Sequence, residues 1–417
     1  MGRWIFIFWG LIFSQVLIAS SLEIAPVLEK GRFHPLSSLN PSQSLDTKLM
    51  LPSRVDPSVW LPLNLLSARE KNFTSYSDSD FKKIRKAYLE GQEEQLDEAL
   101  MGAYATLAGQ PYLTSATHTL TFPSVRQLQA EALYFRYPWT AICCALNALA
   151  VVLLFMGWRI SGYILAFMGF LLLSFLLGIR IYVLERPPVS NMLETLLFVP
   201  WLALLVSFLI KREAVLAAAG LSTLLLGIVA VGTIKDNFEN VQAVLDSNYW
   251  LTIHVLLVVG SYALFLLAGI LAHGYFLGSK EASHKLSGLT QISMYLGLAM
   301  LVPGTILGGI WAAQSWGRFW DWDPKESWAF ITICAYLAGV HAFRYRIIGE
   351  YGLALCAIVG AWTVTFTWYG VNYILGTGLH SYGFGSGGEW IYLVSVVLDA
   401  ALVLLLAAMA KKRWKTV

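Results

Sequence analysis

Residues 250–276 read W-L-T-I-H-V-L-L-V-V-G-S-Y-A-L-F-L-L-A-G-I-L-A-H-G-Y-F and contain no Asp, Glu, Lys or Arg. A helix rises about 1.5 Å per residue, so this run is long enough to cross the roughly 30 Å hydrocarbon core of a bilayer. Similar apolar runs lie at approximately 139–157, 162–184, 193–210, 214–233, 289–310, 327–345, 351–374 and 390–410. The sequence therefore predicts an all-α fold, a polytopic membrane helical bundle of about nine helices over residues 139–417.

The composition supports the membrane class and argues against several others. Hydrophobic residues make up 57% of the 417-residue chain and charged residues 13%, against about 45–50% and about 25% in soluble domains. The net charge of +3 gives no indication of nucleic-acid binding. The four cysteines form no CxxC or CxxCH motif. A thioredoxin-like redox centre, a structural zinc site and covalent attachment of haem to this chain are therefore not expected.

The first 138 residues differ in character from the rest. Residues 1–21 carry Arg3, an apolar run and then small residues, the pattern of a signal peptide or an uncleaved anchor. Residues 22–138 contain several prolines and a charged stretch, 78–98, whose apolar residues have the spacing of an amphipathic helix. We expect an exported N-terminal region that is partly irregular and contains one or two helices.

The distribution of basic residues predicts the orientation. Lys and Arg are concentrated in alternate loops and in the C-terminal tail, which should face the cytoplasm. These residues are Arg159, Lys211, Arg212, Lys280, Lys285, Arg344, Arg346, Lys411, Lys412, Arg413 and Lys415. The loops 185–192, 234–249, 311–326 and 375–389 then lie on the outer side, together with the N-terminal region.

Five tryptophans crowd one outer stretch, residues 311–328, which reads W-A-A-Q-S-W-G-R-F-W-D-W-D-P-K-E-S-W. An interfacial belt needs fewer aromatic residues at each span end, and here charged residues separate them. Indole faces suit a planar macrocycle, and Arg318 suits a carboxylate at its edge. We interpret the stretch as a platform for a flat hydrophobic ligand with anionic edges, with an interfacial belt as the alternative.

Two histidines lie at the level of this platform. His254 is near the outer end of the span 250–276, and His380 follows the span 351–374. Haem iron is commonly held by imidazoles, and these two could fill both axial positions. His341 lies toward the inner end of its span, where an ionisable residue is a functional candidate. His273 is its candidate partner within the chain. For each histidine, a hydrogen-bonding or interfacial role is the alternative.

The segment W-G-R-F-W-D-W-D (316–323) resembles the WGxxWxWD signature of the haem-handling WWD-domain family of cytochrome c maturation. Within that family the chain resembles the CcsA (ResC) branch of System II. The resemblance extends through P-V-S-N-M-L-E-T (188–195), S-N-Y-W-L-T-I-H-V (247–255), D-P-K-E-S-W (323–328) and G-V-N-Y-I-L-G-T-G-L-H-S-Y (370–382). It covers roughly 185–385, with weaker similarity at 31–36 and 128–137.

This resemblance implies roles for individual residues. His254 and His380 correspond to two outer histidines that ligate the iron of haem b, and His341 to a transient ligand within the membrane. The other residues implied to form the haem-binding motif are Trp316, Arg318, Trp320, Trp322, Asp323 and Trp328. No general acid or base is assigned, because Asp323 and Glu326 are candidates either for proton transfer or for organising the loop.

The resemblance also implies a reaction and its partners. Members of the family attach haem to the CxxCH thiols of apocytochrome c at the periplasmic face of the bacterial inner membrane, as part of a holocytochrome c synthase. The implied partners are apocytochrome c, a thioredoxin-like protein that reduces its thiols, and a CcsB (ResB)-like membrane subunit. That subunit would supply the second intramembrane histidine, because the spans 139–157 and 162–184 contain none.

Other functions have different sequence requirements. A haem exporter or chaperone without synthase activity, as in the CcmC and CcmF branches, remains the main alternative. A b-type electron-transfer subunit would need paired histidines deep within two spans. A generic transporter is less favoured, because the spans carry almost no charged residues.

Overall fold

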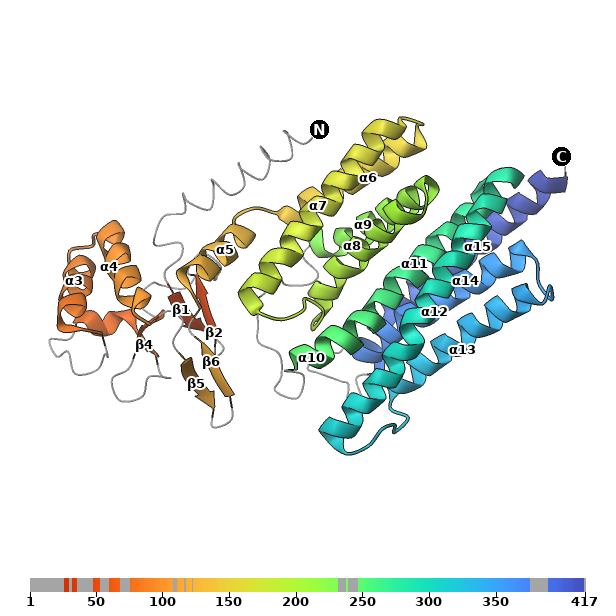
Figure 1. The fold of residues 1–417 in the computed structure, drawn as a ribbon. Coiled ribbons are helices and arrows are strands. Elements are labelled where there is room, and N and C mark those ends of the chain that lie inside the picture. Colours follow the sequence, from red (N-terminus) through yellow and green to blue (C-terminus); the bar gives the residue numbers. More distant parts are fainter. Residues whose placement is uncertain are drawn as a thin grey trace. The chain divides into compact units, whose positions relative to one another are not determined.

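The computed structural model describes residues 26–29, 32–35, 48–52, 60–67, 76–107, 111–115, 118–121, 123–231, 238, 247–375 and 389–415. The chain divides into two compact units. Unit 1 comprises Met1–Trp139, Gly178–Glu185 and Asn237–Asn240, and unit 2 comprises Thr140–Leu177, Arg186–Asp236 and Val241–Val417. Figure 1 labels their helices and strands.

Unit 1 contains more regular structure than the proline-rich sequence suggests. Its described strands form three antiparallel pairs. The pairs are β1 (Pro26–Glu29) with β2 (Arg32–Pro35), β3 (Leu49–Pro52) with β4 (Trp60–Pro62), and β5 (Pro111–Ser115) with β6 (His118–Thr121). A short 3-10 helix, η3 (Leu63–Ser67), precedes the helices α3 (Asp78–Leu89), α4 (Glu93–Ala105) and α5 (Val125–Arg136). The described residues of this region therefore contain three α-helices, where one or two were expected.

The charged stretch of unit 1 folds as its spacing predicts. Ser77 caps α3 by accepting a hydrogen bond from the backbone N–H of Asp80. Phe81 and Ile84 of α3 are buried in one hydrophobic cluster with Leu96 and Leu100 of α4. The polar face of α3 is left at the surface, which explains how a strongly charged segment still contributes to a core.

The two N-terminal stretches with weaker family similarity meet in unit 1. His34 lies on β2, within 31–36, and Glu131 lies on α5, within 128–137. The Nδ1 atom of His34 is 2.8 Å from a carboxylate oxygen of Glu131, and both side chains are buried. Because a buried carboxylate needs a partner, this contact gives the two distant stretches a shared structural role.

Unit 2 contains the remaining helices. In chain order they are α6 (Trp139–Phe155), α7 (Arg159–Leu184), α8 (Met192–Ile210), α9 (Arg212–Ala230), α10 (Asn248–Trp250), the π-helix η5 (Leu251–Val255), α11 (Leu256–Leu277), α12 (Lys280–Trp316), α13 (Pro324–Arg344), α14 (Glu350–Thr365), the π-helix η6 (Phe366–Leu375) and α15 (Glu389–Lys415). The first residue of α6, Trp139, and the last turns of α7, from Gly178 on, belong to unit 1.

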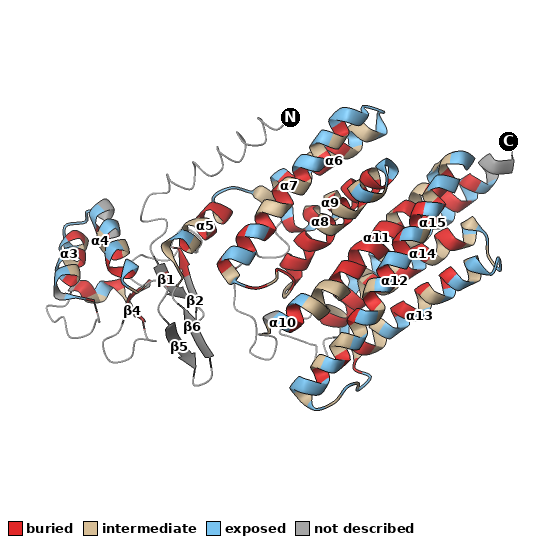
Figure 2. Ribbon diagram, viewed as in Figure 1, coloured by how far each residue is buried: buried red, intermediate tan, exposed pale blue. Residues whose placement is uncertain are grey.

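The helix α11 is at the centre of unit 2. It packs against α8, α9, α12, α14 and α15, and Figure 2 shows that most of its surface is buried. Its contact with α12 is close because Gly297 has no side chain. A Cβ at that position would lie 2.5 Å from the ring of Phe265. Small residues that let helix backbones approach are a common basis of packing in membranes.

The structure confirms a polytopic helical membrane protein. Seven described helices are long and apolar enough to cross a bilayer, or up to eight if α5 and α6 form one broken span. They account for most of the expected apolar runs. The run 327–345 forms α13, which carries more polar residues and is not among the seven.

The helix α12 is longer than its predicted span, 289–310. It extends without interruption from Lys280 to Trp316, and it ends where Gly317 adopts a φ of 72°, a left-handed conformation that favours glycine. Trp311 and Trp316 therefore lie on a helix, while the connecting loop consists of the residues between α12 and α13. This helical support holds part of the tryptophan-rich stretch rigidly.

Candidate functional site

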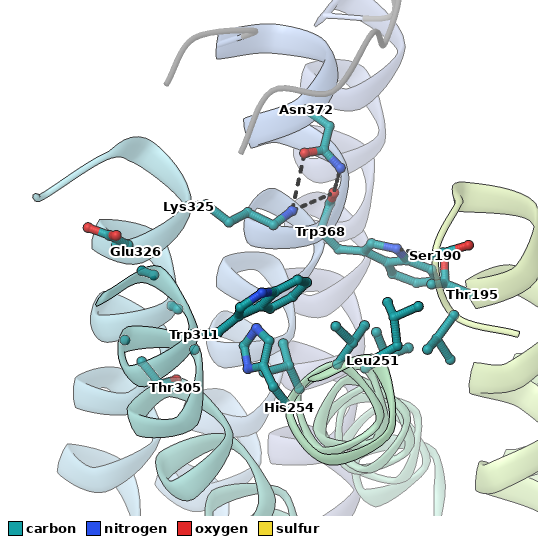
Figure 3. Close-up of a pocket in the computed structure, with 18 of the residues that line it drawn as sticks. Ser190, Thr195, Leu251, His254, Thr305, Trp311, Lys325, Glu326, Trp368 and Asn372 are labelled. Atoms are coloured by element: carbon teal, nitrogen blue, oxygen red, sulfur yellow. Dashed lines mark hydrogen bonds between the residues drawn. The ribbon is translucent and has the colours of Figure 1, made fainter. Parts of the chain in front are cut away.

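Unit 2 contains a cavity of about 220 Å³ bordered by α8, η5, α11, α12, α13 and η6. Its walls are mostly apolar, with few polar groups, as is typical of sites for hydrophobic ligands. Figure 3 shows side chains converging on it from helices that are distant in sequence. The charged or polar side chains of the lining include Ser190, Asn191, Thr195, His254, Thr305, Lys325, Glu326 and Asn372.

His254 lines this cavity from the π-helical turn η5. Its Nδ1 atom lies 2.8 Å from the carbonyl oxygen of Gly304. A carbonyl can only accept a hydrogen bond, so Nδ1 carries the proton and Nε2 carries the lone pair. An imidazole with this tautomer, fixed by a backbone carbonyl, is in the form that ligates iron.

Two glycines one turn apart on α12 determine the place of this ring. A Cβ at Gly308 would lie 2.6 Å from Cε1 of His254, and a Cβ at Gly304 would lie 3.0 Å from a methyl group of Val258. Neither position therefore accommodates a side chain without movement of its neighbour. The segment G-T-I-L-G (304–308) lets the histidine-bearing turn lie directly on the backbone of α12.

Three tryptophans form an aromatic wall of the cavity. Trp311, Trp316 and Trp320 all belong to its lining. The ring centroid of Trp311 is 5.8 Å from that of His254, in an edge-to-face arrangement, and Trp250 stacks on Trp311 with ring centroids 6.3 Å apart. Large aromatic faces therefore lie beside the imidazole of His254.

The other two predicted tryptophans lie elsewhere. Trp322 is 67% exposed, has a φ of 57° and packs edge-on against Trp320 at 5.7 Å. Trp328 packs against Phe366 of η6 with ring centroids 4.1 Å apart. Neither residue lines the cavity. The predicted tryptophans thus divide into Trp316 and Trp320, which face the cavity, and two that support the surrounding structure.

Charged residues of the loop mainly bind one another. Asp323 is the N-cap of α13 and forms a capping box with Glu326. The carboxylate of Glu326 also accepts hydrogen bonds from the backbone N–H of Asp321 at 2.8 Å and from Arg318 at 3.2 Å. The guanidinium of Arg318 lies over the ring of Trp316 and 3.5 Å from the carboxylate of Asp321. In the described chain, Arg318 and Asp323 therefore organise the loop.

The stretch P-V-S-N-M-L-E-T (188–195) forms a further wall. Its Glu194 is fully buried, and its carboxylate accepts hydrogen bonds from Arg186 and from the backbone N–H of Ser190, each at 2.9 Å. Asn191 caps α8. The hydroxyl of Thr195 accepts a hydrogen bond from the indole N–H of Trp368 at 3.1 Å, linking this wall to η6. The motif thus orders the cavity rather than contributing a reactive group to it.

The remaining histidines occupy distinct environments. His341 is exposed on α13, outside the cavity, and its Nδ1–H donates to the carbonyl of Leu337 at 2.7 Å. His273 uses both ring nitrogens, one with the carbonyl of Gly269 at 2.8 Å and one with Asp399 at 3.0 Å. His273 is therefore held by the chain itself, which makes it a poor partner for His341. His380 lies outside the described residues.

Some cavity residues were not singled out from the sequence. Lys325 and Asn372 occur in quoted motifs, but nothing in their spacing indicates that they meet across α13 and η6. Trp250, which stacks on Trp311 from outside the cavity lining, lies one helical turn before His254, a spacing that places both on one side of the helix. Trp368 and Thr195 meet only through the packing of α8 and η6, which local sequence does not reveal.

Known proteins resemble this chain over the region that contains the cavity. The family model of the cytochrome c assembly protein matches residues 189–380. The protein NrfI of Wolinella succinogenes is 34% identical over 298 residues, which are 63% of this chain and 32% of NrfI. The chain therefore spans about a third of that relative's length.

A shorter relative is covered more fully. The cytochrome c biogenesis protein CcsA of Prochlorococcus marinus, strain SARG, is 30% identical over 241 residues, which are 47% of this chain and 75% of the relative. Among solved structures, the cytochrome c haem lyase CcmF aligns with a TM-score of 0.49 at 17% identity, over 65% of this chain and 50% of that one. The family model and the extent of the match to CcsA lead to one conclusion: the chain belongs to the cytochrome c assembly protein family.

Proposed function

We propose that the cavity beside His254 binds haem b and presents it for covalent attachment to apocytochrome c at the periplasmic face of the bacterial inner membrane. The observation that carries this proposal is the state of His254, an Nδ1-protonated imidazole at the edge of a tryptophan-lined cavity. Membership of a family that handles haem supports it. His380 is proposed as the second axial ligand.

The size of the cavity suits presentation better than enclosure. At about 220 Å³, it is smaller than the roughly 300–1,000 Å³ of sites that surround a small ligand. A porphyrin whose iron is ligated by His254 would have only part of its macrocycle inside the cavity, against the aromatic wall. The rest of the macrocycle would remain accessible to a protein partner.

The reaction needs little from the described residues beyond binding and orientation. When haem is bound it supplies two vinyl groups, and each accepts one thiol of the CxxCH motif. A sulfur–carbon bond forms, and the thiol hydrogen is transferred to the vinyl group, so no external oxidant is consumed. The thiols must be reduced, which is the proposed role of a thioredoxin-like partner. Orientation of the reacting groups would supply much of the acceleration.

The test is the haem content of the full chain purified together with a CcsB-like subunit. His254→Gly should lose most of the bound haem and its bis-imidazole absorption spectrum, and added imidazole should restore part of both. His284→Gly is the matched control, because His284 is exposed, pairs with Glu350 and lies near the start of α12, whereas the cavity residues of α12 lie near its end. Normal haem content and spectrum in His254→Gly would refute the proposed ligand.

A second measurement separates the synthase from the alternative of haem delivery alone. Apocytochrome c with reduced thiols is added to the haem-loaded complex, and covalent product is measured after denaturation. Product formation supports attachment by this complex. Transfer of haem without a covalent bond would instead favour an exporter or chaperone.

A further inference from the structure

Lys325 has a place in the cavity that the haem ligands and tryptophans do not explain. It lies in the first turn of α13, is partly buried and belongs to the cavity lining. Figure 3 shows its side chain extending from α13 toward Asn372 and Trp368 of η6. An ammonium group thus lies in the lining of a mostly apolar cavity.

The partners of this ammonium are neutral. It donates hydrogen bonds to the backbone carbonyl of Thr367 at 2.8 Å and to the side-chain carbonyl of Asn372 at 3.2 Å, with the carbonyl of Trp368 at 3.5 Å. Among the described residues, no carboxylate lies within the 4.0 Å ion-pair distance of Lys325. The carbonyl dipoles orient the ammonium, and the nearest carboxylate influence comes from Asp323, which acts on it from beyond ion-pair distance.

The neighbouring acids are engaged by other groups. Glu326 pairs with Arg318 and accepts backbone hydrogen bonds, and Asp323 caps α13. A cation in an apolar wall is costly unless it is paired, so the site is electrostatically incomplete as it stands. A ligand that carries an anionic group would complete it.

We propose that Lys325 binds a carboxylate of the porphyrin and thereby determines which edge of the macrocycle enters the cavity. This inference rests on the proposed function, because it takes haem as the ligand. In haem b the two carboxylates occupy one edge, and the vinyl groups lie away from it. Anchoring the carboxylate edge at Lys325 therefore directs the vinyl groups toward the open side, where a thiol can reach them.

The inference is tested by comparing two ligands that differ only at the carboxylates. Haem and its dimethyl ester have the same iron and the same vinyl groups, so both retain ligation by histidine. The purified complex with its CcsB-like subunit should bind haem about tenfold more tightly than the ester, the effect expected of one charge-assisted contact. Lys325→Met should bind both ligands alike, at the level of the ester.

Two further variants control for structure and for charge. Lys325→Gln keeps a hydrogen-bond donor for Thr367 and Asn372 but removes the charge, so it should also bind haem and the ester alike. It provides the test if Lys325→Met does not insert into the membrane. Lys285→Met removes an exposed lysine that pairs with Glu281, and it should keep the wild-type ratio. The readout is the ratio of the affinities for haem and for its dimethyl ester, so the test does not depend on formation of cytochrome c.

The outcomes separate this inference from the proposed function. Equal binding of haem and ester by the wild-type protein, or a preserved tenfold ratio in Lys325→Gln, would overturn the role of Lys325 while leaving haem binding intact. Failure of the wild-type protein to bind either ligand would instead contradict the proposed function itself.

Discussion

At the scale of single residues, Gly308 determines how closely the ring of His254 approaches α12. Gly308 has no side chain, and a Cβ at this position would lie only 2.6 Å from the imidazole Cε1, too close for the ring to stay in place. The ring is also held through Nδ1 by the carbonyl of Gly304. A methyl group at position 308 must therefore displace the ring, and with it the orientation of Nε2.

We predict that Gly308→Ala lowers haem affinity by about tenfold, because overpacking at a fixed site commonly costs 1–3 kcal/mol. Titration of haem into the purified protein measures this, and imidazole should restore part of the spectrum. Gly288→Ala is the control on the same helix, since a Cβ there meets nothing within 4 Å. Equal affinities in the two variants would show that His254 does not depend on this glycine.

Lys325 should make haem binding depend on pH. Burial lowers the pKa of its ammonium from 10.5 to about 8, and the carboxylate of Asp323 partly opposes this shift. The other charged groups nearby are Glu326 and Arg318 on the same loop, while η6 and α8 present neutral side chains to the cavity. A bound carboxylate favours the protonated form, so the pKa is higher in the complex than in the free protein.

This difference in pKa determines whether haem affinity rises or falls with pH. Below pH 8 the free protein already carries the proton, and haem affinity should be independent of this group. Above pH 8 the free protein loses the proton before the complex does, so affinity should fall by about tenfold in all, the full contribution of the contact, and then level off. Affinity for the dimethyl ester should not fall in this way. Parallel titration of both ligands from pH 7 to about 9.5 checks the prediction.

At the scale of elements, the start of α13 decides how the tryptophan loop is ordered. The backbone N–H of Glu326 donates a hydrogen bond to the carboxylate of Asp323 at 3.0 Å. In turn, the backbone N–H of Asp323 donates to the carboxylate of Glu326 at 3.3 Å. Because the same carboxylate of Glu326 binds Arg318, the cap and the loop form one network. This arrangement favours an organising role for Asp323 over proton transfer.

The two roles predict different results for two substitutions. Asp323→Asn keeps a capping acceptor without an ionisable group, so haem content and cytochrome c yield should remain near wild type. Asp323→Ala removes the cap and should lower the free energy of unfolding by about 1 kcal/mol, with a lower haem content. Thermal unfolding and haem-to-protein ratios measure both. Normal haem content with no cytochrome c formed in Asp323→Asn would point to proton transfer instead.

The helices of unit 2 differ in how well the sequence predicts them. Long apolar runs such as 250–276 predicted helices because each run must satisfy its backbone within the bilayer. The π-helices η5 and η6 could not be predicted, since they depend on packing around His254 and Trp368 rather than on local propensity. The continuation of α12 to Trp316 was also missed, because aromatic density at a span end resembles an interfacial loop.

At the scale of the whole molecule, one face of α13 joins the tryptophan loop to His341. Phe330, Cys334 and His341 are exposed at spacings that place them on the same side of the helix. Phe330 also packs edge-on against Trp322 with ring centroids 6.1 Å apart. An exposed histidine on a helix expected to lie in the membrane favours a covering partner, which is the place proposed for the CcsB-like subunit.

His341 has the same tautomer as His254, because its Nδ1–H donates to a backbone carbonyl and leaves the lone pair on Nε2. His273 is engaged through both ring nitrogens, so a second imidazole for His341 is expected from the partner subunit. Haem would then enter between the two proteins and move outward to the cavity. We predict that His341→Ala leaves the cavity residues in place but starves the cavity of haem, and that added imidazole restores part of the supply.

The decisive measurement is the haem occupancy of the cavity when His341→Ala is co-expressed with the partner. Occupancy should fall several-fold relative to wild type, yet haem added directly to the purified variant should bind with normal affinity, because His254 and the aromatic wall are unchanged. His284→Ala, which removes an exposed histidine paired with Glu350, should keep normal occupancy. If His341→Ala retains full occupancy and a normal yield of cytochrome c, His341 is structural and haem reaches the cavity by a route that does not include it.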